Sequence, residues 1–443
     1  MRLSGPFTQK RLMAGARSVR DVAGGGWSAG VRGVKDVAYS FTEPSWSADQ
    51  RTVVLPAEMR QDRLDWLLLF LTLGLFGLGL TMVFSSSTFV AQFKGMGPYD
   101  RLIGQGLRGL VGIGLLILFA RLDYRRWSTH WGVLAVVTSA ALLILVLIPG
   151  IGHASKGAQR WIGIPPFVIQ PTEFARVALI VYLARVLSRR PERVEGFVTG
   201  PLPALLVTAL FVGLIGLQKS LGSMIAMMAT TIVMSIAAGM RWKHFFWLTA
   251  PVVALGGLAV LGATVFHAYQ LDRIVNWIAY WLGTDNPQGE TYQLHQSVMA
   301  LGSGGLLGAG LGAGQQKWFF LPDNHTDFIY SIVGEEMGFV GTFGLLVALA
   351  VFIWRGLSIA GEAEDRYGYL LAAGLTANFA IYVTINLSVV TGLFPTTGLP
   401  LPLVSYGGSA LIANMTAVGL LLSVSRFRGG GIILSGRIRR RSA

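Results

Sequence analysis

The feature that most restricts the fold of this chain is a succession of apolar runs, each about 20 residues long. A run of this length spans the bilayer hydrocarbon as a helix, and within lipid every backbone group must be hydrogen-bonded internally. We therefore predict an all-α polytopic membrane protein with about ten transmembrane helices. The expected limits are 64–86, 102–120, 131–149, 171–187, 201–217, 221–238, 245–266, 328–354, 367–390 and 407–425.

The composition supports a membrane protein and argues against two other classes. Of the 443 residues, 53% are hydrophobic and only 13% are charged, which is too apolar for a soluble protein of this size. The net charge of +14 is spread over short loops and both ends, so it follows membrane topology and does not indicate nucleic-acid binding. The absence of cysteine excludes disulfides and thiol chemistry.

The distribution of basic residues predicts the orientation. Basic clusters occur at 121–126, 189–193, 241–243 and 355–366 and in both tails, and these regions alternate with loops that carry few cations. The positive-inside rule then places both termini in the cytoplasm. We expect a disordered basic tail over 1–63, a membrane domain over 64–425 and a basic tail over 426–443. No apolar core of signal-peptide length precedes residue 64, so the first spanning helix is expected to direct insertion.

Three segments are then expected on the outer side. The loop over 267–327, between helices seven and eight, is long enough to predict a function, and its apolar pieces predict short helices at the membrane interface. The loop over 150–171 carries basic residues, and the Gly- and Pro-rich segment over 390–406 predicts irregular backbone tucked against the helices. No nucleotide triphosphate is available on this side, so chemistry there needs an activated, membrane-borne substrate.

Asp327 is the first candidate for chemistry. It ends a polar stretch, Pro322 to Asp327, and an apolar helix follows directly. One interpretation is structural, because Thr326 and Asp327 are favoured capping residues at a helix N-terminus. The other is a general base, with Asp327, Ser331 and Gly334 on one side of the helix lining a cavity.

Two further groups of ionisable residues fall inside predicted helices. Glu335 and Glu336 are either members of a structural ion pair or protonated carboxyls, because charges in lipid need partners. Glu173 and Arg176 are three residues apart and share a helix face. They either neutralise each other or meet an anionic substrate in a polar cavity.

Outer cations and a histidine complete the candidates. Arg160, Lys156 and Lys317 are predicted to face outward and, with Arg176, to bind a pyrophosphate. His325 and Asp323 flank the Asp327 region, and a divalent cation, Mg²⁺ or Mn²⁺, is a possible ligand there, although the spacing matches no tight metal motif. The glycines over 302–314 contain no Walker pattern, so no nucleotide cofactor is expected.

Four segments carry a family resemblance, and they cover most of 64–425. They read KGAQRWIGIPPFVIQPTEFAR (156–176), YQLHQSVMALGSGGLLGAGLG (292–312), QKWFFLPDNHTDFIYSIVGEEMGFVG (316–341) and TTGLPLPLVSYGGS (396–409). In this order they resemble the SEDS family, which includes FtsW, RodA and SpoVE. The tail and the last segment are more similar to the division members, typified by FtsW, than to the elongation members, typified by RodA.

The resemblance implies a peptidoglycan glycosyltransferase that polymerises lipid II at the outer face of the bacterial inner membrane, at the division septum. It implies a class B penicillin-binding protein (FtsI-like) and other divisome proteins as partners. Asp327 matches the essential acid of the family's His-Thr-Asp-Phe motif. The substrate-binding candidates are Arg160, Glu173, Arg176, Lys317, His325, Thr326, Ser331 and Ser405.

One departure and the rival functions remain open. Lys219 and Ser220 stand where the family commonly has Pro-Asp, so a role for that acid is in doubt here. The rival functions are an elongation-type polymerase, a flippase for the same lipid-linked precursor, and a non-catalytic scaffold. Buried ionisable residues suit a carrier, whereas the apparent lack of inverted repeats with broken helices argues against one.

Overall fold

A computed structural model describes residues 64–427 except 94, 96, 156–157, 165–166, 190–200, 241–267 and 290. The predicted helix over 245–266 and the two tails, 1–63 and 428–443, lie outside the described residues. The other predicted spans are all helical. They are α2 (Trp66–Phe93), α3 (Asp100–Arg121), α4 (His130–Leu145), α5 (Pro171–Ser188), α7 (Pro201–Leu217), α8 (Leu221–Ala237), α12 (Ile329–Gly361), α13 (Arg366–Val390) and α14 (Gly408–Arg426).

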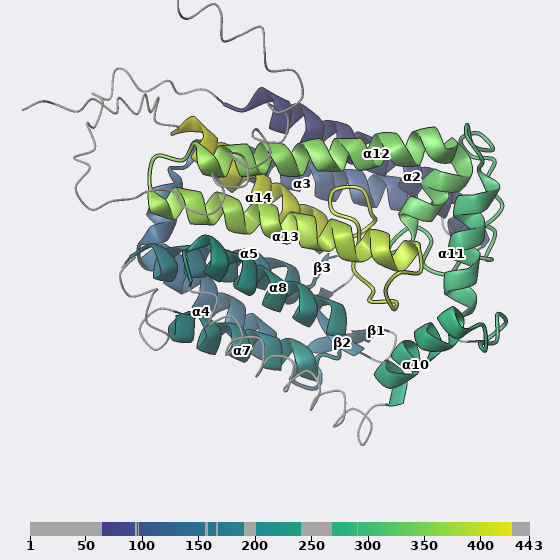
Figure 1. The fold of residues 1–443 in the computed structure, drawn as a ribbon, viewed down its shortest axis with the longest axis horizontal. Helices are drawn as coiled ribbons and strands as arrows, with labels where there is room; N and C mark the ends of the chain where they lie inside the picture. The colour runs from purple at the N-terminus through teal and green to yellow at the C-terminus, as the bar shows by residue number, and fades with distance from the viewer. Residues whose placement is uncertain are drawn as a thin grey trace, which may run out of the picture. The chain divides into compact units, whose positions relative to one another are not determined.

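The lengths of these helices fit a protein that crosses the membrane several times. Five of them, α2, α3, α12, α13 and α14, are long and apolar enough to span a bilayer, and α4, α7 and α8 are shorter apolar helices. Within residues 64–427, α13 lies between α12 on one side and α5 and α8 on the other (Figure 1). α4 and α7 pack beyond α5 and α8, and α3 packs along α14.

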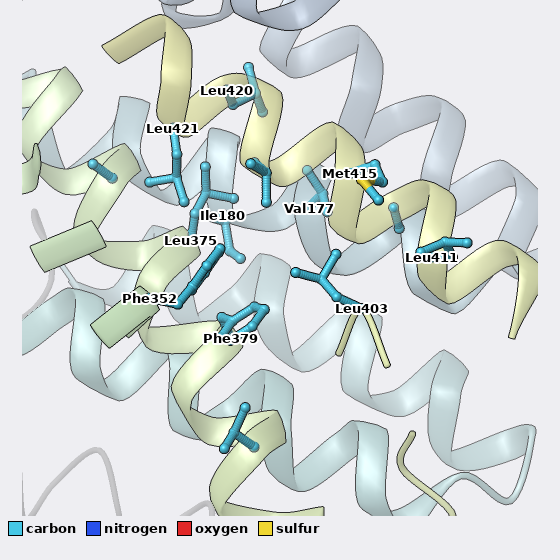
Figure 2. Packing of buried hydrophobic residues seen from close by; sticks show 14 of the residues in the cluster. Val177, Ile180, Phe352, Leu375, Phe379, Leu403, Leu411, Met415, Leu420 and Leu421 are labelled. Atoms are coloured by element: carbon cyan, nitrogen blue, oxygen red, sulfur yellow. The ribbon is translucent and has the colours of Figure 1, made fainter. Parts of the chain in front are cut away.

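The core lies where α5, α12, α13 and α14 meet. Figure 2 shows Val177 and Ile180 of α5 facing apolar side chains of the neighbouring helices. The rings of Phe352 and Phe379 stack with centroids 4.1 Å apart and join α12 to α13. Because lipid tails are as apolar as these side chains, close packing and the few polar contacts supply the preference for this arrangement.

The loop over 150–171 forms a small sheet that the sequence did not predict. β1 (Gly152–Ser155), β2 (Ala158–Ile164) and β3 (Phe167–Ile169) pair antiparallel in the order β1-β2-β3. Ile162 pairs with Gly152 on one side and with Ile169 on the other. The sheet leads straight into α5, where Pro171 occupies the first turn as expected.

α12 is interrupted, although its sequence predicts a continuous helix. Gly338 has φ 65° and ψ −161°, which breaks the helical hydrogen-bond ladder inside the span. The segment over 305–310 bonds to the freed groups, with Ala309 N donating to Glu335 O (2.9 Å) and Phe339 N donating to Gly305 O (2.8 Å). A Cβ on Gly308 would stand 2.2 Å from Glu336 O, so the glycine-rich run permits this close approach.

The segments over 267–327 and 391–407 have the local structure that was predicted for them. The loop between the seventh and eighth predicted spans contains two short helices, α10 (Ala268–Leu282) and α11 (Tyr292–Ser303). Residues 391–407 have no regular structure. Leu399, Leu401 and Val404 are nevertheless buried, so this segment is tucked against the helices as expected. Its position decides the geometry of the candidate site.

Candidate functional site

Asp327 lies half-buried immediately before Phe328, the N-cap residue of α12. The amide nitrogen Nδ2 of Asn386 donates to Asp327 O and to Leu399 O, each at 2.8 Å. The carboxylate oxygen Oδ2 of Asp327 is 3.6 Å from where a Cβ on Gly398 would stand. The buried Asn386 side chain thus holds Asp327 against the irregular 391–407 segment.

Thr326 does not serve as the cap of α12. Its hydroxyl donates to the carbonyl of Asp323 at 3.0 Å and so closes the preceding turn. Phe328 has no side chain that can accept a hydrogen bond, and no side-chain capping bond is formed by that residue. Thr326 therefore stabilises the turn before α12 and not the first turn of the helix.

His325 is held by a chain of directed hydrogen bonds. Its Nε2 lies 2.7 Å from Arg101 Nη1, and its Nδ1 lies 3.1 Å from Asn324 Oδ1. A guanidinium only donates, so Nε2 accepts and the ring proton sits on Nδ1, which donates to Asn324. The ring also packs on Tyr406 with centroids 5.5 Å apart. Neither ring nitrogen is left to bind a metal ion in this arrangement.

One face of α3 extends this polar region, and the sequence analysis did not single it out. Gln105 Nε2 donates to Ser405 O (3.2 Å), and Arg108 Nη1 donates to the Tyr406 hydroxyl (3.1 Å). Arg101, Gln105 and Arg108 follow at intervals of four and three residues, so they share one face of the helix. The sequence does contain this pattern, because three polar residues recur at helical spacing within an otherwise apolar run.

Two predicted substrate-binding serines bond within the protein. Ser331 is fully buried, and its hydroxyl lies 2.7 Å from the hydroxyl of Ser297, which also donates to Val390 O. Ser331 therefore joins α11 to α12 and does not line a cavity, contrary to the predicted face. Ser405 Oγ accepts from Leu401 N at 2.8 Å and stabilises the irregular segment from within.

Glu173 and Arg176 pair with each other, which is one of the two interpretations that their shared helix face left open. Glu173 Oε2 lies 2.9 Å from an Arg176 nitrogen, and their side chains are 3% and 4% exposed. Arg176 also donates to Asn378 Oδ1 and Asn414 Oδ1, each at 2.7 Å. Its guanidinium lies 4.3 Å from the centroid of the Tyr382 ring. The interior of the bundle thus surrounds this pair with neutral partners.

Lys317 corrects a prediction, because it does not face outward. Its side chain is 7% exposed, and Nζ lies 2.9 Å from Glu336 Oε1 and 2.5 Å from Gly312 O. The Ser85 hydroxyl donates to the same carboxylate at 2.7 Å. A carboxylate inside the membrane domain is stable only with a partner, so the nearest cation folds in to meet it.

Glu335 anchors the glycine-rich segment beside this pair. Its carboxylate accepts from the backbone N–H groups of Gln315 (2.6 Å) and Gln316 (3.2 Å). Glu336 thus forms the predicted structural ion pair, whereas Glu335 is satisfied by backbone N–H groups. Both residues hold the segment that leads from α11 to Asp327.

Arg160 reaches from β2 to the end of α7. Its Nε donates to Gln218 O at 3.0 Å, and a second guanidinium nitrogen donates to Lys219 O. Carbonyls at a helix C-terminus carry partial negative charge, which suits this cation. Lys156, its predicted companion, lies outside the described residues.

α10 fixes the other end of the irregular segment. Arg273 Nη1 donates to Thr396 O, and the indole nitrogens of Trp277 and Trp281 both donate to Gly392 O, each bond being 2.9 Å. These contacts were not predicted, because the sequence does not reveal which loop α10 covers. They place a fourth element around the backbone beside Asp327.

The turn between α10 and α11 is also ordered by polar contacts. Thr291 Oγ1 donates to Asp285 Oδ2 at 2.5 Å, and His295 Nε2 lies 2.7 Å from the same oxygen. These bonds, with that from Thr291 the strongest, hold the pKa of Asp285 below its ordinary value. The turn therefore keeps α10 close to α11 at neutral pH.

The predicted divalent cation finds no ready protein site. In the part of the chain that the structure describes, no three His, Asp or Glu side chains gather in a metal-binding arrangement. His325 is bonded to Arg101 and Asn324, so it does not fit as a ligand. A cation bound through substrate phosphates stays a prediction.

Comparison with known proteins agrees with the resemblance noted in the sequence. The profile of the FtsW/RodA/SpoVE family, described as "Cell cycle protein", matches residues 65–429. Stage V sporulation protein E of Bacillus subtilis (strain 168) is 41% identical over 367 residues, or 82% of this chain and 97% of that protein. A probable peptidoglycan glycosyltransferase FtsW of Geobacter metallireducens is 40% identical over 369 residues, or 83% of this chain and 96% of that protein.

Solved structures show the same arrangement of helices. The rod shape determining protein RodA of Thermus thermophilus is similar with a TM-score of 0.60 and 29% identity, over 83% of this chain and 98% of that one. A chain from a peptidoglycan synthase complex, solved to describe how polymerization and crosslinking are coordinated, gives a TM-score of 0.64 and 31% identity. That match covers 83% of this chain and 99% of the other.

Proposed function

Because the chain belongs to the FtsW/RodA/SpoVE family, we propose that it is a peptidoglycan glycosyltransferase that polymerises lipid II at the outer face of the inner membrane. The observation that carries this function is the placement of Asp327. The residue is half-buried at the mouth of α12, the amide of Asn386 bonds to its backbone carbonyl, and its carboxylate lies beside Gly398. A carboxylate at this position can take a proton from a hydroxyl group that is bound beside it, as a general base requires.

The proposed reaction uses two lipid-linked sugars. A hydroxyl oxygen of one sugar forms a bond to the anomeric carbon of the other, and the bond from that carbon to the undecaprenyl pyrophosphate breaks. The electron pair leaves with the pyrophosphate, and Asp327 takes the hydroxyl proton. Arg101, which bonds to His325, and Arg160, at the end of α7, are the cations whose charge would stabilise the departing group. Holding both reactants in one orientation supplies a large part of the acceleration.

The biological setting is part of the same proposal. Similarity of about 40% to FtsW and SpoVE proteins favours a division-type enzyme at the septum over an elongation-type one. A synthase complex among the similar structures supports a transpeptidase partner, for which we propose a class B penicillin-binding protein of the FtsI type with other divisome proteins. The basic loops support cytoplasmic termini.

The test uses purified protein, with and without the transpeptidase, supplied with lipid II and Mg²⁺. The wild type should yield polymeric glycan on a gel. Asp327→Asn should reduce polymer formation by about a thousandfold or more, because the base is lost while the shape is kept. Asp323→Asn is the matched control, since it removes a neighbouring carboxylate from the same turn, and it should remain active.

The alternatives make different predictions in the same preparation. A flippase would form no polymer but would move lipid II across a vesicle membrane, and its dependence on Asp327 would appear in that assay. A scaffold would form no polymer alone and would support a partner enzyme equally well after Asp327→Asn. Polymer formation by the variant at the wild-type rate would exclude Asp327 as the base.

A further inference from the structure

A buried tyrosine at the start of α13 has no hydrogen-bond partner for its hydroxyl. Tyr367 is 6% exposed, and its ring stacks on that of Tyr124 with centroids 6.1 Å apart. The hydroxyl of Tyr124 donates to Asp365 Oδ2 at 2.9 Å, whereas that of Tyr367 meets no partner among the described residues. An enclosed hydroxyl left in this way is costly, so it is placed to meet a group that the chain itself does not supply.

A cation with the same property lies beside this tyrosine. Arg185 is in the last turn of α5, and its guanidinium interacts electrostatically with the Tyr367 hydroxyl. The two helices touch, because a Cβ on Gly374 would stand 2.9 Å from the Ile180 side chain. Nη1 of Arg185 is enclosed and has no hydrogen-bond partner in the part of the chain that the structure describes. Since a guanidinium only donates and a hydroxyl can donate, the missing group is an acceptor.

The neighbouring cations differ from Arg185, because each has found a partner. Arg125 pairs with Glu364 Oε2 at 2.5 Å and with Asp365 Oδ2 at 3.1 Å. Arg366 donates to a carbonyl at the end of α8 at 2.7 Å. These two acids therefore neutralise Arg125, and no carboxylate among the described residues forms an ion pair with Arg185.

A second cation lies on the same face of α5. Arg189 follows Arg185 by four residues, is exposed, and repels it electrostatically. A helix C-terminus attracts cations in general, but that attraction does not provide an acceptor for an enclosed N–H group. Two like charges at this spacing destabilise the end of the helix unless a negative charge lies beside them. The missing acceptor is therefore an anion.

The position of this cluster in the bundle indicates which anion it is. Tyr367 lies in the first turn of α13, one of the helices long enough to span a bilayer, and Arg185 lies where the predicted span over 171–187 ends. Basic clusters surround both places in the sequence, at 121–126, 189–193 and 355–366. Phospholipid headgroups lie at this depth, and basic pockets between helices on the cytoplasmic side bind the anionic ones.

We propose that Arg185, Arg189 and Tyr367 bind the phosphate group of an anionic phospholipid. The site lies where α5 and α13 meet the short 3-10 helix η2 (Tyr124–Ser128). Phosphate oxygens would accept from the guanidinium and the hydroxyl, would screen the two cations from each other, and would tie α5 to α13. Almost the whole length of α13 separates this site from Asn386 and the candidate site around Asp327.

The test measures how phospholipid changes thermal stability. Full-length protein in dodecyl maltoside is titrated with phosphatidylglycerol, and the rise in Tm gives an apparent Kd. Arg185→Gln should raise this Kd about tenfold and Tyr367→Phe about threefold, because each removes a contact to the phosphate. Without phospholipid, both variants should unfold at or above the wild-type Tm, because each removes an enclosed polar group that has no partner.

Matched controls separate binding from packing. Tyr124→Phe makes the same change on the stacked ring, but its hydroxyl has a partner, so it should lower Tm equally with and without phospholipid and leave Kd unchanged. Arg126→Gln removes an exposed cation from η2 and should also leave Kd unchanged. Wild-type Kd in both Arg185→Gln and Tyr367→Phe would overturn the inference. Equal Tm shifts in these variants with and without phospholipid would also overturn it, because a buried water would then satisfy the two groups.

Three further titrations identify the source of the negative charge. Phosphatidylcholine has the same phosphate without net charge and should bind about tenfold more weakly. Equal binding of the two lipids would contradict the inference, because the contacts would then be to the acyl chains. If inorganic phosphate or a glutamate-rich peptide raises Tm through Arg185 and phosphatidylglycerol does not, the site binds a free anion or a protein segment and the phospholipid assignment is wrong.

Discussion

Glu173 and Asp327 both lie at the start of a helix, but their surroundings in the folded protein differ. Each carboxylate lies at the start of a helix, Glu173 in the first turn of α5 and Asp327 just before the cap of α12. Glu173 is 2% exposed and pairs with Arg176, whereas Asp327 is half-buried beside backbone that carries no fixed charge of its own. Local sequence thus allows an acid at either place, and the surrounding helices decide how deeply each one is buried.

The same contrast separates the cations. Lys317 and Arg176 are each enclosed with a carboxylate partner, while Arg101 is half-buried and bonds to the imidazole of His325. A cation whose charge is already balanced contributes to stability, and one with neutral partners can still meet an anionic substrate. Three changes test whether the molecule is divided in this way.

The largest effect on stability is expected at the enclosed pair. Arg176→Met should destabilise the protein by about 3–5 kcal/mol, because it leaves the buried Glu173 carboxylate without its counter-charge. Adding Glu173→Gln should recover a large part of that loss, because a neutral amide can remain inside. Unfolding in detergent, followed for both single variants and the double variant, gives the coupling.

The opposite result would assign Glu173 and Arg176 to the candidate substrate site around Asp327. If Arg176→Met unfolds like the wild type but forms no polymer, the pair belongs to the substrate site and not to the framework.

A smaller effect on stability and a large one on activity are expected at Arg101. Arg101→Gln should lower kcat/KM for lipid II by about a hundredfold, because a positive charge beside His325 is lost. Tm should shift by only a few degrees, since the residue is half-buried and Asn324 still holds the ring. Arg101→Lys should recover part of kcat/KM, because it retains the charge. If both variants instead lose kcat/KM to the same extent and both have a much lower Tm, the role of Arg101 is purely structural.

The smallest effect is expected where α10 meets the irregular segment. Trp277 and Trp281 donate to the same carbonyl of Gly392, so either can keep that oxygen bonded when the other is lost. Trp277→Phe or Trp281→Phe alone should cost about 1 kcal/mol or less, and the double variant more than the sum. Thermal unfolding and polymer yield of the three variants check this, and simple additivity would show that the two bonds act independently.

Much of the framework could be predicted from the chain alone. The spacing of apolar runs predicted every span that the structure describes, and the interval between Glu173 and Arg176 placed them on one helix face, where they pair. The break at Gly338 could not be predicted from the local sequence. The backbone groups that it leaves without helical partners bond to residues 305–310, which belong to a different segment of the chain. Lys317 was misplaced for a similar reason, since its counter-charge lies 19 residues further along.

The sequence by itself determined that the chain crosses a membrane, which family it joins and which acid stands at the mouth of the eighth predicted span. Apolar length and short motifs are local properties, so they can be read without coordinates. Only the tertiary structure decided which charges are balanced. Asn386, Gly398 and Arg101 come from separate helices and loops, and helix packing alone brings the first two to Asp327 and the third to His325.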